Sequence, residues 1–484
     1  MRILRFVGIT IVALIGLALV AWVVGNQVMR GQTQKSLAQQ ASAIAAHREA
    51  QRAVPAPTPA ATPAATPSVT PSDTPTAAPS AAPAAASVPD APAAPTITWT
   101  TGWSGFRGAQ RDGHYSAGPI RTDWTTLRPL WRQPVGGGHA SFVAANGHAF
   151  TIEQRGPQEV AVAYDILTGR ELWTNAWDAA FIVSQGGPGP RATPAIHDGT
   201  LFVLGAAGEL RALNASDGKL RWRTNILDDA DAGNLSFGMA ASPLIVGNTV
   251  ITVPGGGNGR TIVAYDRASG RAAWSALDDE AAYSSPVRVT LAGVEQIVAV
   301  LADRIVSLSP DRGALLWESP WPADGGNHAA QPVIIGEDRI FFSSGSGSIR
   351  GAALEITRDG DRLTAREVWR TNRMKNDITS SVYYDGFIYG IDQGILACID
   401  AATGDLKWKA GRYGNGQTLL ASGHLVITTG DGEVVLVRAA PEAHQEIART
   451  GALEGNTWNH PALVDGFLLV RNGAQMAAFD LRPR

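Results

Sequence analysis

The sequence predicts an all-β chain folded as a closed ring of eight four-stranded antiparallel blades, a β-propeller, with seven blades as the alternative. Three observations lead to this prediction. A segment that runs from aspartate through a glycine turn to tryptophan recurs about every 40–50 residues. The chain holds 53 glycines, and its 14 tryptophans outnumber its 8 tyrosines. Alternation of β-branched residues, as in Thr249–Val253, excludes a repeat built from helix pairs.

Residues 1–30 are predicted to form a cytoplasmic tip and a membrane-spanning signal anchor. Phe6–Val24 is an unbroken run of apolar or small residues, long enough to cross a bilayer core of roughly 30 Å as a helix. Arg2 and Arg5 precede it, which predicts a cytoplasmic N-terminus and an exported remainder. A cleaved signal peptide is the alternative, which the length of the run disfavours. We therefore expect a single-pass inner-membrane protein with its propeller in the periplasm or another extracytoplasmic space.

Two segments separate this anchor from the propeller, which is assigned to residues 97–484. Residues 31–53 are predicted to be a juxtamembrane helix or a weakly helical spacer. Their apolar or small side chains share roughly one helical face, at Leu37, Ala41, Ile44 and Ala45. Residues 54–96 are almost entirely Pro, Ala, Thr and Ser, which predicts a disordered, extended linker. At about 3.1 Å per residue, it would reach on the order of 100 Å from the membrane.

Each repeat is predicted to form one blade. An apolar strand leads to a glycine turn, and the next strand ends in tryptophan. Upstream lie two more strands joined by a tight turn such as Asn146–Gly147. The clear copies are Tyr164–Trp173, Leu213–Trp222, Tyr265–Trp274, Leu308–Trp317 and Ile399–Trp408. A degenerate copy ends at Trp369, and another, around Leu436–Arg449, lacks the tryptophan.

The two ends of the repeat array predict how the ring closes. The last unit, Pro461–Leu481, has three strands and no tryptophan strand. Leu127–Arg132 is a lone tryptophan strand with no unit before it. Joining the two completes an eighth blade and leaves no open sheet edge.

These residues resemble the pyrroloquinoline-quinone-like (PQQ-like) propeller repeat, which carries Asp-x-x-Thr-Gly-x-x-x-Trp once per blade. Asp165–Trp173 and Asp400–Trp408 match this segment in full. The resemblance covers the chain from about Trp99 onward and implies the propeller fold. One branch of the family, the quinoprotein alcohol dehydrogenases, implies a quinone and Ca²⁺ on the axis, with a vicinal disulfide and acidic metal ligands. A second branch, the propeller lipoprotein of the outer-membrane β-barrel assembly machinery, implies a non-catalytic scaffold.

Composition narrows the possible functions. The 484 residues carry a net charge of −3, only 17% are charged, and no Lys/Arg run occurs, so nucleic acid is not an expected partner. Cys398 is the only cysteine. It rules out an intramolecular disulfide, a cysteine-based zinc cluster and a lipid-bearing cysteine after the apolar run. We expect Cys398 to be inert core.

Polar loops that enter the innermost strands are predicted to gather at one mouth of the central channel, where Glu153 and Arg155 join them from a loop between the second and third strands of their blade. The predicted ligand-binding residues are His139, Glu153, Arg155, Arg191, Asn327, His328, Lys375, Asn376, Asp377, Tyr413, Trp458, Asn459 and His460. Arg155, Arg191 and Lys375 would attract an anionic ligand, and Tyr413 or Trp458 would stack on a flat one. The alternative is that these loops satisfy one another and seal the channel with water.

Other constellations are interpreted as structural. His139, His328 and His460 each fit a hydrogen-bonding loop histidine better than a zinc ligand, so no metal site is predicted. Ser242-Pro243 and Ser284-Ser285-Pro286 recur where strands begin, which favours a structural repeat over a nucleophile. The segment before the ring is expected to cover the propeller, with Arg107, Arg111 and Asp112 pointing inward.

The sequence therefore predicts a binding or scaffold module for an envelope protein or peptide, or for a small polar ligand, without catalytic residues or cofactor. The alternative is a quinone-dependent oxidoreductase of reduced form. It would hold PQQ and Ca²⁺, with Glu153 and Asp377 as the acidic ligands near the axis.

Overall fold

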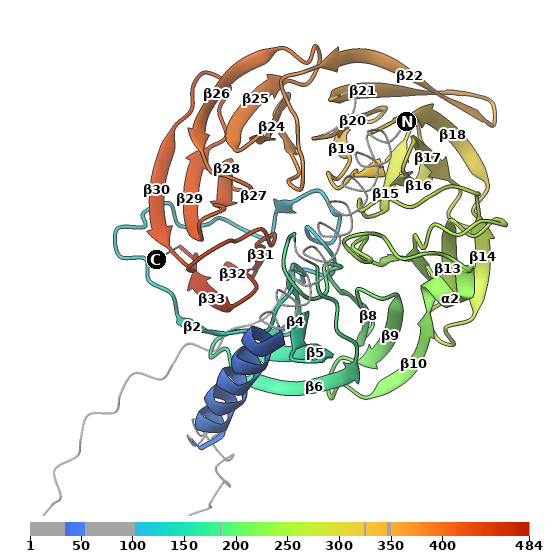
Figure 1. Cartoon of the computed structure of the whole chain (residues 1–484). Helices are drawn as coiled ribbons and strands as arrows, with labels where there is room; N and C mark the ends of the chain where they lie inside the picture. The colour runs from blue at the N-terminus through green and yellow to red at the C-terminus, as the bar shows by residue number, and fades with distance from the viewer. Residues whose placement is uncertain (1–33, 54–101, 184, 324–325, 346–349, 484) are drawn as a thin grey trace, which may run out of the picture.

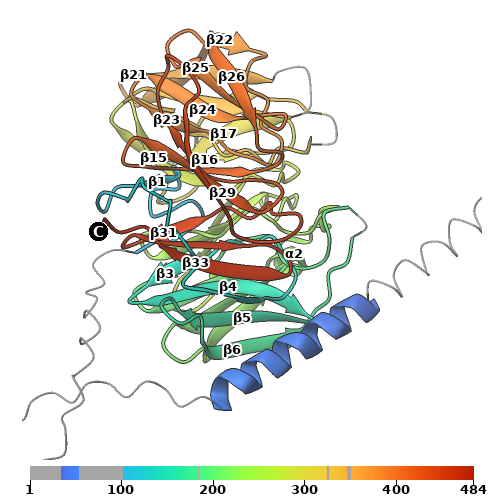
Figure 2. The same cartoon turned by 90° about the vertical axis from the view of Figure 1, so that its left-hand side faces the viewer.

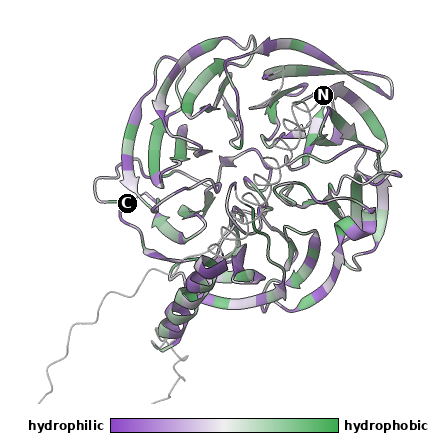
Figure 3. Ribbon diagram, viewed as in Figure 1, coloured by the Kyte–Doolittle hydropathy of each residue, from purple (hydrophilic) through white to green (hydrophobic). Residues whose placement is uncertain are grey.

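The structure, a computed structural model, describes residues 34–53, 102–183, 185–323, 326–345 and 350–483. Within these ranges the chain forms a ring of eight four-stranded antiparallel blades (Figure 1), as the sequence predicts. Each blade runs from an innermost strand at the axis to an outermost strand at the rim. Figure 3 shows the inner strands largely hydrophobic and the rim strands alternating between hydrophilic and hydrophobic residues.

The blades are numbered in chain order. Blades 1 to 4 are β3 (Val143–Ala145), β4 (His148–Arg155), β5 (Gln158–Asp165) and β6 (Glu171–Asp178); β7 (Ala195–His197), β8 (Thr200–Leu204), β9 (Glu209–Asn214) and β10 (Leu220–Asn225); β11 (Leu244–Val246), β12 (Thr249–Thr252), β13 (Ile262–Asp266) and β14 (Ala272–Ala276); and β15 (Val287–Leu291), β16 (Val294–Val300), β17 (Arg304–Leu308) and β18 (Leu315–Pro320). A short helix, α2 (Ile226–Ala230), follows β10.

Blades 5 to 8 complete the ring. They are β19 (Val333–Ile335), β20 (Arg339–Ser343), β21 (Gly351–Asp359) and β22 (Arg362–Thr371); β23 (Val382–Tyr384), β24 (Phe387–Asp392), β25 (Ile395–Asp400) and β26 (Leu406–Arg412); β27 (Gln417–Ala421), β28 (His424–Thr428), β29 (Glu433–Arg438) and β30 (Glu446–Gly451); and β31 (Ala462–Val464), β32 (Phe467–Arg471), β33 (Gln475–Asp480) and β2 (Trp131–Pro134). A further strand, β1 (His114–Tyr115), pairs in parallel with β27.

Contacts between neighbouring blades explain the repeated glycine and tryptophan. The indole of a rim strand covers the glycine turn of the next blade and donates its N–H to a carbonyl there. Trp173, for example, donates to Ala215 O at 2.9 Å, and a Cβ on Gly218 would lie 2.4 Å from its ring. Equivalent bonds join Trp131 to Ile166, Trp222 to Arg267, Trp369 to Ala401 and Trp408 to Ala440. The motif therefore joins each of these blades to the next through a hydrogen bond and a packing contact.

The same contact explains where the motif degenerates. Strand β30 carries Ala448 where other rim strands carry tryptophan. Blade 8, which follows it, has no glycine turn to cover, because its third and fourth strands come from opposite ends of the chain. Blade 5 has a long β21–β22 hairpin in place of the short turn, and Trp317 of blade 4 donates instead to Gln296 of its own blade.

Ring closure occurs as the sequence predicts. Strand β2 pairs antiparallel with β33, with Trp131 opposite Ala478 and Pro134 opposite Gln475. Side chains of blades 8, 1 and 7 share one buried hydrophobic cluster across this region. Since β2 and β33 complete one sheet, the ring of described strands has no open gap.

Residues 34–53 form a helix that packs on the edge of blade 1 (Figure 2). None of the helices in the described ranges is long and apolar enough to cross a membrane. The predicted anchor Phe6–Val24 and the predicted linker 54–96 both lie outside those ranges.

Glu159 on β5 is a buried carboxyl between blades 1 and 2, where it accepts hydrogen bonds from the Ala206 N–H at 2.8 Å and the Trp177 indole at 3.1 Å. Burial raises its pKa from 4.5 to about 7. The folded state therefore holds this proton more tightly than the unfolded chain, so stability falls as the pH rises from 4.5 to 7. The free energy of unfolding of the wild type should therefore fall by roughly 3 kcal/mol more between pH 4.5 and pH 8 than that of a Glu159→Gln variant, which has no carboxyl to titrate at this position. Denaturant unfolding at the two pH values measures this difference. Identical pH profiles for wild type and variant would contradict the assignment.

Candidate functional site

A cavity of about 500 Å³ opens at the mouth of the channel where the innermost strands begin. We call it the mouth pocket. Its aromatic and polar lining includes Phe106, His139, Arg191, Phe237, Tyr283, Asn327, Asp377, Asn415, Trp458 and His460. Cavities of this size and mixed character are typical of ligand sites.

Six of the thirteen predicted residues meet in this pocket. They are His139, Arg191, Asn327, Asp377, Trp458 and His460. They come from loops that precede innermost strands of different blades, and the ring brings these loops together on the axis. Asp377 is the only carboxylate among the described lining residues.

Arg191 supplies the positive charge of the pocket. Its guanidinium lies 5.6 Å from the ring of Phe181 and 6.0 Å from that of Phe237. It donates to the carbonyls of Gly187 and Gly189, which uses two of its five N–H groups. Burial lowers its pKa to about 10, so Arg191 is charged at neutral pH and suited to an anionic ligand.

His139 and Trp458 form a stacked pair at the pocket wall, with ring centroids 5.5 Å apart. The Nε2 atom of His139 pairs with the carbonyl of Gly186, while its buried Nδ1 has no hydrogen-bond partner among the described residues. Burial lowers the pKa of His139 to about 4. The imidazole is therefore neutral near pH 7, and Nδ1 presents a lone pair.

The remaining seven predicted residues do not line the mouth pocket, because each satisfies a local partner. Lys375 pairs with Asp392 at 3.0 Å, and Tyr413 donates to Glu446 at 2.9 Å. The buried amides of Asn376 and Asn459 donate to backbone carbonyls of Ile391 and Ala140. His328 pairs with the carbonyl of Trp321.

Glu153 and Arg155 lie away from the mouth pocket for a different reason. Both belong to strand β4 rather than to a loop. Glu153 is fully buried and accepts from the Gly136 N–H at 3.0 Å, and it forms an ion pair with Arg155. Burial acts to raise its pKa, but the charges of Arg155 and Arg471 hold it below the usual value. These two residues lie under the helix of residues 34–53 and not at the channel mouth.

Three aromatic residues of the lining were not among the predicted ligand-binding residues: Phe106, Phe237 and Tyr283. Tyr283 immediately precedes the Ser284-Ser285-Pro286 segment. An aromatic residue just before a serine that begins an innermost strand could therefore have identified it as a lining residue. Phe237 contacts Tyr283, with ring centroids 5.7 Å apart.

The strand-entry hydroxyls are structural. The N–H of Ser141 donates to Thr193 Oγ1, that of Thr193 to Ser242 Oγ, and that of Ser242 to Ser285 Oγ, each at 2.9 Å. These bonds connect four successive blades around the axis. They confirm that the Ser-Pro segments are repeats of the fold.

The segment before the ring plugs the channel (Figure 1, cyan). Arg107 donates to Ser381 O at 2.7 Å, and Arg111 donates to the carbonyls of Ser242, Pro243 and Pro286. Burial lowers the pKa of Arg107 to about 10 and that of Arg111 to about 9. The inward orientation of both arginines agrees with the sequence prediction.

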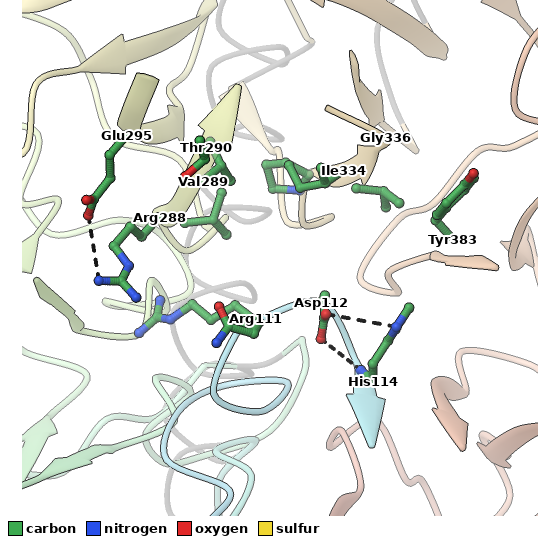
Figure 4. A pocket seen from close by; sticks show the side chains of 14 residues that line it. Arg111, Asp112, His114, Arg288, Val289, Thr290, Glu295, Ile334, Gly336 and Tyr383 are labelled. Carbon is green, nitrogen blue, oxygen red and sulfur yellow. Dashed lines mark hydrogen bonds and ion pairs between the residues drawn. The ribbon is translucent and has the colours of Figure 1, made fainter. Parts of the chain in front are cut away.

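A second cavity, of about 560 Å³, is lined by Arg111, Asp112 and His114 of this plug and by residues of strands β15 and β19 (Figure 4). Three of its charged side chains have partners within the cavity. Arg288 and Glu295 lie 3.6 Å apart, and the backbone N–H of His114 donates to Asp112 at 2.9 Å. Arg111 also lines this cavity, but its guanidinium is buried and donates to three backbone carbonyls. This cavity is therefore the weaker candidate site.

The mouth pocket does not fit the quinone and Ca²⁺ of the dehydrogenase branch. Ca²⁺ takes six to eight oxygen ligands, usually with several carboxylates. Asp377 is the single carboxylate that the described residues bring to the lining, and Glu153 is paired with Arg155. Across the described residues, no three His, Cys, Asp or Glu side chains are grouped to hold a metal ion.

Comparison with known proteins identifies the family. The family model for outer membrane protein assembly factor BamB matches residues 156–410, more than half of the chain. The chain belongs to the BamB family of PQQ-like propellers. It is similar to BamB of Bordetella pertussis, with 22% identity over 298 residues that cover 60% of this chain and 70% of that protein.

The BamB-family propeller is also similar to proteins named for other activities. Tetrathionate hydrolase of Acidithiobacillus ferrooxidans is 24% identical over 298 residues, which cover 58% of this chain but only 51% of that enzyme. The solved structure of quinohemoprotein alcohol dehydrogenase ADHIIG from Pseudomonas putida HK5 aligns with a TM-score of 0.54 at 14% identity, covering 79% of this chain and 81% of that one. At this identity the alignment shows the shared propeller fold alone.

Proposed function

We propose that this chain is a non-catalytic envelope propeller, held in the inner membrane by Phe6–Val24, that binds an extended segment of a partner protein in its mouth pocket. The membership in the BamB family supports an envelope protein as the partner. The apolar run and the two arginines before it support the anchor.

The lining of the mouth pocket is the observation that carries the proposal. Phe237, Tyr283 and Trp458 line the pocket together with one half-buried cation, Arg191. Aromatic residues combined with a desolvated arginine are the composition of binding hot spots. The segment best suited to this lining carries an acidic group for Arg191 beside an apolar or aromatic side chain.

Nothing in the pocket chemistry favours the oxidoreductase alternative. His139 is neutral, His460 contacts the backbone carbonyls of Pro461 and Thr418, and the part of the chain that the structure describes contributes one carboxylate, Asp377, to the lining. Native mass spectrometry of the full chain from its own envelope tests this point. An adduct with the mass of PQQ plus Ca²⁺ would overturn the non-catalytic proposal.

Site-directed photocrosslinking in the envelope tests the binding proposal. With p-benzoylphenylalanine at Trp458 in the full chain, we expect a crosslink to a discrete envelope protein. Arg191→Ala should reduce its yield about tenfold, equivalent to about 1.4 kcal/mol. The matched control places the same probe at Leu220, which is exposed on the rim. Equal crosslinking from both positions, or an Arg191→Ala yield equal to wild type, would contradict the mouth pocket as the binding site.

A further inference from the structure

The helix of residues 34–53 buries one face against the propeller. Leu37, Ile44 and Arg48 are only 4%, 1% and 2% exposed. Their spacing of seven and four residues places them on one side of a helix. Ala45, which the sequence placed on the same face, is exposed.

Hydrogen bonds join this helix to blade 8 at the closure of the ring. Gln40 Nε2 donates to Val135 O at 2.9 Å and to Gly473 O at 2.6 Å. Arg48 donates to the Gln133 side chain at 2.6 Å and to Pro134 O at 2.9 Å. The helix therefore contacts both the closing strand β2 and the turn that precedes β33.

Arg48 also ties the helix to blade 1. Its guanidinium lies 5.0 Å from the ring centre of Tyr164, and its Nε is 3.4 Å from Glu171. Glu171 in turn pairs with Arg155 at 2.8 Å. A buried guanidinium is stable only where carboxylates and hydrogen bonds compensate it. The propeller thus presents a specific receptor for Arg48, which we call the seam site: Gln133, Pro134, Glu153, Arg155, Tyr164 and Glu171.

The segments on either side of the helix are long enough that its position on the propeller is not dictated by chain connectivity. Residues 54–101 separate the helix from the propeller, so chain connectivity alone does not force the helix onto the seam site. On the other side, residues 25–33 separate it from the apolar run, and they span at most about 30 Å.

We propose that the seam site is a helix-binding site whose occupant is the helix of residues 34–53. Docking there holds the propeller next to its membrane anchor instead of at the far end of the Pro/Ala-rich segment. The membrane part of this inference rests on the anchor proposed above. It replaces the sequence expectation that residues 54–96 set the distance from the membrane.

An engineered disulfide tests the docking in the full chain. A Cβ on Gly156 would lie 3.8 Å from the Cβ of Ala41, the typical separation in a disulfide. We expect Ala41→Cys with Gly156→Cys to crosslink, so that protease cleavage at a site inserted within residues 54–96 releases the two fragments only after reduction. Ala45→Cys with Gly156→Cys is the matched control and should not crosslink. The native Cys398 is buried and does not interfere.

Two further variants keep the test decisive. Arg48→Ala in the crosslinking chain should slow disulfide formation about tenfold, since it removes the buried anchor. Because Gly156 has φ +58°, its substitution risks misfolding, and maleimide labelling offers an independent readout. Ile44→Cys should label at least about tenfold more slowly than the neighbouring Ala45→Cys. Equal labelling, or fragments that separate without reduction, would overturn the docking.

The outcomes for docking and anchoring are separable. Extraction of membranes with alkaline carbonate measures the anchor, and crosslinking measures the helix. A crosslinked chain that leaves the membrane would overturn the anchor and the membrane-proximal position but retain the seam site. A chain that stays in the membrane without crosslinking would overturn the seam site alone.

Discussion

A Glu153→Ala variant is expected to lose about 3–5 kcal/mol of unfolding free energy, because it leaves buried positive charge without its carboxylate. Glu153 is fully buried, pairs with Arg155 and accepts from the Gly136 N–H. Arg471, also buried, contributes to the low pKa of Glu153. Denaturant unfolding of the purified full chain at neutral pH measures the loss.

Glu318→Ala serves as the control for this prediction. Glu318 also pairs with an arginine, Arg304, but its side chain is about half exposed. Exposed ion pairs contribute about 0–1 kcal/mol. If the two variants lose the same stability, the pair under the helix is no more than a solvated ion pair, and the seam site loses its electrostatic basis.

Gly218→Ala is expected to lower the free energy of unfolding by about 3 kcal/mol, since the added methyl group obstructs the tryptophan–glycine contact between blades 1 and 2. Gly218 has φ +71°, which costs an alanine roughly 1–2 kcal/mol. Its Cβ would also lie 2.4 Å from the ring of Trp173. Forcing an indole out of a packed position adds roughly 1–3 kcal/mol.

Gly199→Ala separates these two contributions. Gly199 lies in the same blade with φ +67°, but no atom lies within 4 Å of the position its Cβ would take. We expect it to show only the conformational cost, about 1 kcal/mol. Equal unfolding midpoints for the two variants would mean that the tryptophan contact does not stabilise the ring.

The fold was predictable because its determinants repeat along the chain. A glycine turn and a tryptophan recur in most blades, since each must fit the neighbouring blade. Closure was predictable from the unpaired tryptophan strand around Trp131. The loss of tryptophan in β30 at Ala448 was visible in the sequence, but its cause, a following blade without the turn, required the ring.

The site was less predictable, because the direction of a side chain depends on the strand that carries it. Glu153 and Arg155 were predicted to lie in a loop, yet strand β4 extends for eight residues and includes both. Tyr413 read as a stacking surface, but its buried hydroxyl meets Glu446 between rim strands. Arg48 binds residues that are far from it in the sequence, and no local sequence pattern predicts its contact with Gln133.

The pairing of β2 with β33 also constrains the order in which the protein is completed. Strand β2 is synthesised before any blade, and its partner ends at Asp480. During translation the edge of β2 stays unpaired until β33 emerges, and a chain that ends before β33 cannot close the ring by this pairing. An exposed edge of this kind invites pairing with other chains. A folding intermediate in which β33 has not yet paired with β2 is therefore exposed to aggregation through this strand edge.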